Sequence, residues 1–167
     1  MAQEFSFSWQ WNLRSSPQAI WPFAADTNRF NRDTGQPEVE MLDNVKGTKY
    51  VRMKLPILRV EWEEEPFEWT YPYSFGILRT YSRGPISEMR VQANFDPQPE
   101  GGTCIRYQTW IKTNNLLAQL TIPFVIGVIA KRRFEKAFRL YDDIANEPGA
   151  VTGTSSRRGL GSRGRAR

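Results

Sequence analysis

The residues with the clearest capacity for chemistry are five glutamates within residues 60–69, the segment VEWEEEPFEW. Clustered carboxylates can act as a general acid and base or can bind a metal ion. Acid catalysis needs one of them buried with a raised pKa. Along a strand, however, Glu61 and Glu63 lie on the face opposite Trp62, where they meet water. We therefore predict solvated glutamates at the rim of a sheet, an interior supplied by Trp62 and Trp69, and neither a catalytic nor a metal-binding residue in this cluster.

Arg79 is the most suggestive single polar residue. It is in phase with Phe75 and Tyr81 on a predicted strand, which directs its guanidinium to the apolar side. A buried arginine needs a partner. Three interpretations stay open: a structural ion pair with Glu68 or Asp26, a surface arginine that extends its charge to solvent, or an anchor for a ligand carboxylate or phosphate.

Several kinds of site are excluded by composition. The chain has no histidine and a single cysteine, Cys104. Histidine-based triads, His/Cys zinc sites and an intramolecular disulfide are therefore ruled out. The N-terminal segment MAQEFSFSWQ lacks the pattern of a signal peptide. We expect a cytoplasmic protein with no cofactor and no metal.

The net charge of +5 is located in the C-terminal segment of the 167-residue chain. Residues 149–167 hold five arginines and no acid, which leaves 18 basic and 18 acidic residues in the rest. A neutral body argues against specific nucleic-acid binding. Membrane contact is expected only through the basic tail. The length suits one domain.

Alternation of apolar and polar residues predicts a run of antiparallel strands. In the first, Phe7, Trp9 and Trp11 alternate with polar residues. The clearest alternation covers residues 86–96, and the turn DPQPEGG then leads into a returning strand. Further strands are predicted at residues 38–43, 48–55, 57–64, 67–71, 74–82 and 103–112.

The remaining elements are helical. Ser16 and Pro17 suit the start of a short helix, which Pro22 distorts or divides. A long helix is predicted from Asn114 to about Ala145, with a kink in its first half, LLAQLTIPFVIGVIA. That half is apolar all round, which predicts burial on several sides. A membrane span is disfavoured because it needs about 20 apolar residues.

This order of elements resembles the helix-grip fold of the START-like superfamily, the polyketide-cyclase/dehydrase-like ligand-binding proteins. The resemblance covers residues 4–146 and depends mainly on SPQAIWPFAADTNRFNRDTG, VEWEEEPFEWTYPYSFGILRTYSRGP and GGTCIRYQTW. It implies an α+β fold in which a curved antiparallel sheet of about seven strands surrounds a long C-terminal helix, with two short helices after the first strand.

A narrower resemblance concerns the segments IWPFAADTNRFNR, EEPFEW and RTYSRGP. They are similar to the START-like domain N-terminal to bacterial class III adenylate/guanylate cyclases. This implies a sensory or regulatory module joined by a linker to a downstream domain. The chain itself contains no catalytic part of a cyclase.

We therefore predict a START-like domain at residues 1–147, followed by a flexible Gly/Ser/Arg-rich linker or tail at residues 148–167. The domain is expected to bind a hydrophobic or amphipathic small molecule, without catalysis, between the sheet and the C-terminal helix. Two alternatives stay open: an enzyme of the polyketide cyclase or dehydratase type, and a co-chaperone-like interaction module. The candidate cavity residues are Trp9, Trp11, Trp21, Trp62, Trp69, Phe75, Arg79, Met89, Val91, Phe95, Tyr107 and Phe124.

Overall fold

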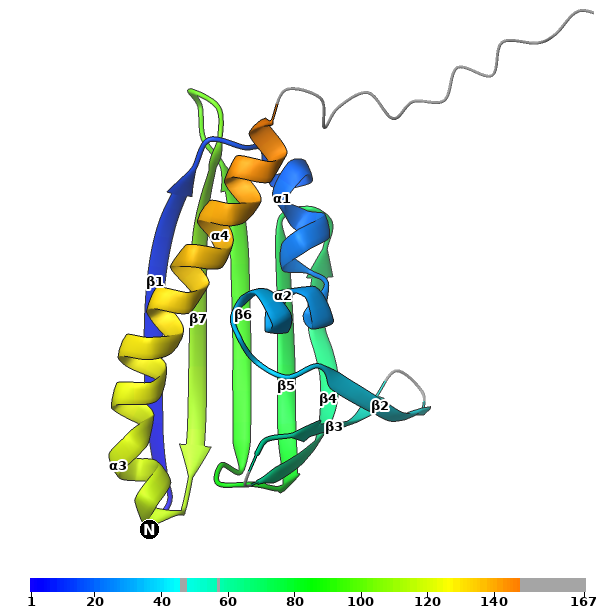
Figure 1. Cartoon of the computed structure of the whole chain (residues 1–167), viewed down its shortest axis with the longest axis vertical. Coiled ribbons are helices and arrows are strands. Elements are labelled where there is room, and N and C mark those ends of the chain that lie inside the picture. The colour runs from blue at the N-terminus through cyan, green and yellow to red at the C-terminus, as the bar shows by residue number, and fades with distance from the viewer. Residues whose placement is uncertain (46–47, 57, 148–167) are drawn as a thin grey trace, which may run out of the picture.

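The computed structural model describes residues 1–45, 48–56 and 58–147; the predicted tail at 148–167 lies outside the described residues. Its centre is a seven-stranded antiparallel sheet in the order β1-β7-β6-β5-β4-β3-β2. Figure 1 shows the long C-terminal helix crossing one face of this sheet, with the two short helices beside it. The α+β helix-grip architecture is thus confirmed.

The strands follow the alternating pattern of the sequence. In β1, Trp9 and Leu13 are buried beneath the helices, whereas Gln10 between them is exposed. β1 pairs with β7 in unbroken register along its whole length. The strands are β1 (Gln3–Leu13), β2 (Val39–Val45), β3 (Thr48–Lys54), β4 (Arg59–Thr70), β5 (Ser74–Arg83), β6 (Glu88–Pro97) and β7 (Thr103–Thr113).

β4 differs from the prediction in one respect. Residues 57–64 and 67–71 were expected to form separate strands, but the single strand β4, Arg59–Thr70, contains most of both; residue 57 lies outside the described residues. Pro66 cannot donate to the ladder, and a bulge directly after it restores the pairing with β5. The ring of Phe67, at the bulge, covers Gly76 so closely that a Cβ atom there would lie 2.3 Å from Phe67 Cε2. Glycine at this position allows the bulge to pack against β5.

Two short helices follow β1, as expected. α1 (Pro17–Ala24) has proline in its first turn, and Pro22 lies inside it. α2 (Thr27–Asp33) begins after Asp26, whose side chain accepts a hydrogen bond of 3.0 Å from the backbone N–H of Arg29. This cap separates the two helices and sets the start of the second.

The long terminal helix has three parts. α3 (Leu116–Phe124) is capped by Asn115, a π-helical segment η1 (Val125–Ala130) follows directly after it, and α4 (Lys131–Asn146) completes it. A kink was predicted at Pro123, which lies inside α3; the change from α-helical to π-helical hydrogen bonding begins two residues later, at Val125. No helix in the described part of the chain is both long enough and apolar enough to cross a bilayer.

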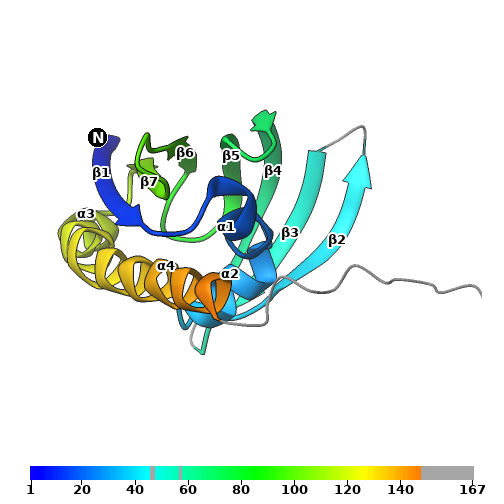
Figure 2. The same cartoon turned by 90° about the horizontal axis from the view of Figure 1, so that it is seen from above.

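The first half of this helix is not buried on several sides, so that expectation is wrong. Ala118 and Ile122 are buried against the sheet, but Leu116, Leu117 and Leu120 are 74%, 70% and 80% exposed. Figures 1 and 2 show why: the sheet lies along one side of the helix, and no other described element covers the opposite side.

The main core lies under the second half of the helix. Phe134 meets Trp9 edge-on with ring centroids 5.8 Å apart, and Phe138 lies 5.1 Å from Trp11. Tyr141 is fully buried beneath α1 and α2. Burial of each such ring stabilises the fold by about 2–3 kcal/mol, which is sufficient reason for its presence.

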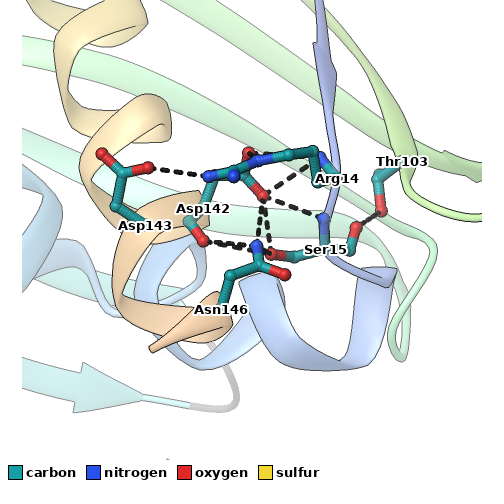
Figure 3. A network of polar contacts seen from close by, with 6 residues as sticks. All are labelled: Arg14, Ser15, Thr103, Asp142, Asp143 and Asn146. Atoms are coloured by element: carbon teal, nitrogen blue, oxygen red, sulfur yellow. Dashed lines mark hydrogen bonds and ion pairs between the residues drawn. The ribbon is translucent and has the colours of Figure 1, made fainter. Parts of the chain in front are cut away.

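A polar network attaches the end of α4 to the turn between β1 and α1 (Figure 3). The Asp142 carboxylate accepts hydrogen bonds from the backbone N–H groups of Arg14 at 3.1 Å and Ser15 at 2.8 Å, and from Ser15 Oγ at 2.6 Å. Asn146 donates to Ser15 Oγ, and Thr103 Oγ1 donates to the Ser15 carbonyl, both at 2.6 Å. Three segments distant in sequence are joined here, which holds the helix across the sheet.

Candidate functional site

The candidate site is a cavity of about 370 Å³ between the concave face of the sheet and the helices. Strands β3 to β7 supply one wall, and α1, α2, η1 and α4 supply the other. Figure 2 shows these helices gathered on one side of the curved sheet. Aromatic and aliphatic side chains form most of the lining, which favours an apolar occupant.

A buried ion pair is set into the sheet wall of this cavity. Arg79 Nε donates to Glu64 Oε2 at 2.8 Å, and Trp62 Nε1 donates to the same oxygen at 3.3 Å. The Arg79 guanidinium also lies 5.4 Å from the centre of the Trp62 ring. Side chains of Glu64 and Arg79 are only 7% and 20% exposed. The residues are brought together because Glu64 pairs directly with Arg79 across β4 and β5.

Arg79 retains hydrogen-bonding capacity. Its bond to Glu64 uses Nε, and its terminal nitrogens form no hydrogen bond with any carboxylate in the described chain. Burial lowers the pKa of Arg79, but the charge of Glu64, the hydrogen bond to it and the two nearby tyrosines, Tyr81 and Tyr107, together outweigh burial and raise the pKa, so the side chain stays charged. The pair as a whole is neutral, with donors left over for an acceptor atom.

Two tyrosines share this wall. Burial raises the pKa of Tyr107 to about 12, against the opposing effect of Arg79. Burial also raises the pKa of Tyr81, whose hydroxyl lies 3.9 Å from Met89 Sδ. Both hydroxyls therefore stay protonated near neutral pH. Tyr107 can donate to a ligand, and Tyr81 can do so in place of its long hydrogen bond of 3.9 Å to Met89 Sδ. Together with Arg79 they form a patch rich in donors, which suits a carbonyl, carboxylate or phenolic oxygen.

Two further buried polar side chains line the cavity. Thr109 is 4% exposed, and its Oγ1 has no hydrogen-bond partner among the described residues. Asn31, on α2, is 7% exposed and faces the cavity from the opposite wall. A buried hydroxyl without a partner is uncommon, and a bound molecule would be one means of satisfying it.

The structure divides the twelve candidate residues into two groups. Trp9, Trp21 and Phe95 are buried in the core outside the cavity lining, and Trp11 packs against that core. Phe124 is 61% exposed and lies away from the cavity. The candidates that do line it are Trp62, Trp69, Phe75, Arg79, Met89, Val91 and Tyr107. Trp69 is nevertheless 54% exposed, so it supplies less of the interior than expected.

The glutamate cluster matches the predicted solvated rim only in part, since Glu61 and Glu68 are half-buried. Glu63 and Glu65 are exposed, and Glu61 is bonded to Arg52 at 2.8 Å. Glu64 is the correction: it is buried and serves as the partner of Arg79. No group of three or more potential metal ligands occurs among the described residues.

The partners suggested for Arg79 are occupied elsewhere. Glu68 accepts hydrogen bonds from Ser74 and Gln92, and Asp26 caps α2. The burial of Glu64 could have been inferred from its position in the alternating pattern, because it shares a strand face with Trp62. Its cross-strand register with Arg79 could not, since the register depends on the bulge in β4.

Sequence reasoning missed the helical half of the lining. Phe30, Ile126, Ala130, Phe134 and Phe138 face the cavity from α2, η1 and α4. The periodicity of α4 indicated that Phe134 and Phe138 point inward. It could not distinguish a residue that fills the core from one that borders a cavity.

No protein-family model matches the sequence, and a comparison with curated proteins gave no match. Solved structures do share the fold. The Zhui aromatase/cyclase from Streptomyces sp. R1128 is 11% identical, with a TM-score of 0.69 and coverage of 89% of this chain and 100% of that one. A conserved protein from Geobacillus kaustophilus is 14% identical, with a TM-score of 0.62 and coverage of 84% and 97%. Ara h 8.0201 is 9% identical, with a TM-score of 0.59 and coverage of 86% of this chain and 98% of that one.

At such low identity the similarity concerns the fold. It extends over most of this chain and nearly all of each of those chains. The chain therefore shares the helix-grip fold of these proteins, which is the fold that the order of its elements predicted.

Proposed function

We propose that this protein binds a hydrophobic or amphipathic small molecule in the cavity between the sheet and the helices. The observation that carries the proposal is a cavity of about 370 Å³, lined mainly by apolar side chains and containing the neutral Glu64–Arg79 pair. Ligand sites have this form: an apolar volume of roughly 300–1,000 Å³ with few polar anchors.

The polar wall indicates what part of the ligand would lie where. Arg79, Tyr81 and Tyr107 offer donors, whereas Glu64 is already occupied by Arg79 and Trp62. An oxygen acceptor on the ligand would lie against this wall, and its apolar part would lie toward Phe30, Ile126 and the rest of the helical wall. An anchor of this kind fixes orientation more than it adds affinity.

A pair of threonines provides a matched test. Thr109→Phe places a phenyl ring in the cavity and removes a hydroxyl that has no described partner, while Thr80→Phe makes the same change at an exposed position on β5. Organic extracts of the purified proteins are analysed by mass spectrometry, and binding of the apolar probe N-phenylnaphthylamine is measured by fluorescence. Loss of co-purified ligand and probe binding in Thr109→Phe alone is expected.

Equal probe binding by both folded variants would contradict the proposal, as would a wild-type protein that neither retains a ligand nor binds the probe. Thermal unfolding shows whether Thr109→Phe is folded. If it is not, Val91→Phe, on the neighbouring strand β6, provides a second cavity-filling variant.

A second candidate function is catalysis of the polyketide cyclase or dehydratase type. It is favoured by the clustering of Arg79, Tyr81 and Tyr107 on one wall of an apolar cavity, where their donors can polarise a carbonyl oxygen. Incubation of the identified ligand with the protein separates the two functions. A new product that the Thr109→Phe variant does not form supports catalysis, and an unchanged ligand supports binding alone.

The narrower proposal is that ligand occupancy is sensed by a downstream cyclase-like domain. Its support is the resemblance of the segments IWPFAADTNRFNR, EEPFEW and RTYSRGP to START-like domains ahead of class III nucleotide cyclases. Sequencing of the gene beyond the codon for Arg167 tests this. Cyclase catalytic residues there would support a regulatory role, and an immediate stop codon would contradict it.

A further inference from the structure

The outer side of α3 and η1 carries an apolar surface that does not pack against the sheet. We call it the α3 ridge. Its members are large apolar side chains, between 37% and 80% exposed: Leu116, Leu117, Leu120, Phe124, Val125 and Val128. A single exposed leucine needs no explanation, but a continuous row along several helical turns does.

Packing against the sheet does not require these residues. Ala118 and Ile122 are the buried residues of α3, and Ile126 of η1 packs beside them against Phe5 and Ile111. The α3 ridge lies on the opposite side, which no other described element covers in either view of the fold (Figures 1 and 2). Something outside the described chain is needed to remove it from water.

The charges beside the α3 ridge are all of one sign. Residues 114–134 contain no aspartate or glutamate. Lys131, Arg132 and Arg133 are exposed on the first turn of α4, and none of them forms an ion pair with a described carboxylate. The helix is therefore apolar outside for its first turns and cationic directly afterwards.

We propose that the α3 ridge docks on the surface of an anionic phospholipid bilayer. Leu117, Leu120 and Phe124 enter the boundary between headgroups and acyl chains, and Lys131 and Arg132 meet the lipid phosphates. Helices that lie in a membrane surface combine an apolar face with flanking cations in this way. From Leu116 to Val128 the helix extends about 18 Å, which suits a helix lying in the surface.

Charge complementarity favours a bilayer over a second copy of this chain. If two copies paired through the α3 ridge, the cationic turn of each copy would lie beside residues 114–134 of the other copy or extend past them. Those residues contain no aspartate or glutamate. Lys131 and Arg132 would gain no partner. An anionic bilayer supplies an apolar layer and negative charge together, so it satisfies both halves of the helix.

The main test uses the triple variant Leu117→Gln/Leu120→Gln/Phe124→Gln, which changes only exposed side chains. The matched control is Met41→Gln/Leu42→Gln/Leu55→Gln, where the side chains are also exposed but lie on β2 and just after β3. Each full-length protein is sedimented with vesicles of phosphatidylcholine containing about one-third phosphatidylglycerol, and with vesicles of phosphatidylcholine alone.

We expect wild type and control to bind the anionic vesicles and the triple variant to bind at least about tenfold more weakly, because each leucine contributes through its buried methylene groups. Lys131→Gln/Arg132→Gln should bind the same vesicles about 10- to 30-fold more weakly, and wild-type binding should fall at high salt. Binding to neutral vesicles should be weaker for every protein.

Two results would overturn the proposal. Equal binding of wild type and the triple variant would assign membrane binding to another part of the chain, such as the arginines of the tail, which all variants retain. Absence of wild-type binding, combined with a dimer in light scattering that the triple variant loses, would assign the α3 ridge to a second copy. Neither result bears on the cavity, which the threonine variants test separately.

Discussion

The network at the end of α4 allows a quantitative prediction. Asp142→Asn keeps the shape of the side chain but removes its charge and one acceptor oxygen. The substituted side chain can still accept from Ser15 N and Ser15 Oγ through Oδ1, at the 2.8 and 2.6 Å contacts. Its amide nitrogen would then face the backbone N–H and Nε of Arg14, which now lie 3.1 and 3.2 Å from Oδ2 of Asp142. The N–H groups of the new amide would then face two N–H groups of Arg14, and neither side would supply an acceptor.

The expected loss follows from the burial of each group. A hydrogen bond to a charged group contributes about 1.5–3 kcal/mol. The backbone N–H of Arg14 lies 3.1 Å from both oxygens of Asp142, so the substitution leaves it one neutral acceptor in place of two charged ones. The buried bonds from Ser15 also become bonds to a neutral acceptor. The Arg14 side chain is 68% exposed, so its Nε returns to water at little cost. We therefore expect Asp142→Asn to lower the free energy of unfolding by about 2–3 kcal/mol.

Asp143→Asn is the matched control because it makes the same change one residue along the helix. Asp143 also pairs with Arg14, at 2.8 Å, but its side chain is 70% exposed. An exposed pair contributes about 0–1 kcal/mol. Urea unfolding followed by tryptophan fluorescence measures both variants. If the two substitutions have equal effects, the buried network does not hold the helix as described, and the reasoning from burial fails.

Two further predictions concern the pH dependence of the Asp142 network and the coupling between Glu64 and Arg79. Burial alone raises the pKa of Asp142, but hydrogen bonds from Ser15 and Arg14 outweigh it and lower the pKa below the ordinary value of 3.8. The stabilisation from Asp142 is thus complete above that pH and is lost as the pH falls through the folded-state value, so the stability difference between wild type and Asp142→Asn should shrink in acid. A constant difference in urea midpoints from neutral pH down to acid would refute this. For the cavity pair, Glu64→Leu should cost about 3–5 kcal/mol in urea unfolding because it leaves Arg79 buried without its carboxylate, whereas Glu64→Leu/Arg79→Met should cost less than Glu64→Leu alone. Additive losses would show that the two side chains are not coupled.

The secondary structure could be predicted from local patterns, and the fold class from the resemblance that the order of the elements shows to the helix-grip fold. Alternation in β1, β6 and β7 and the helical period of α4 are consequences of backbone geometry, which every residue in the element repeats. The break between α1 and α2 and the irregularity after Pro123 follow from capping and from proline chemistry. Such signals are contained in neighbouring residues, so no tertiary information is needed to use them.

The site was only partly predictable. Phase alone placed Arg79, Tyr81 and Phe75 on the apolar side of β5, and all three line the cavity. Composition and phase could not separate them from Trp9 and Phe95, which are equally apolar and equally in phase but fill the core. The difference depends on where the helix lies above the sheet, and that is a property of the packed molecule.

The sequence by itself therefore determined which residues form strands and helices, which faces are apolar, and which chemistries the missing histidine excludes. The tertiary structure alone decided that Glu64, and not Glu68 or Asp26, pairs with Arg79, because cross-strand register depends on the bulge in β4. It also decided that the apolar first half of the terminal helix is half exposed. Hydrophobicity records that a residue avoids water, but only the arrangement of neighbouring elements determines whether anything covers it.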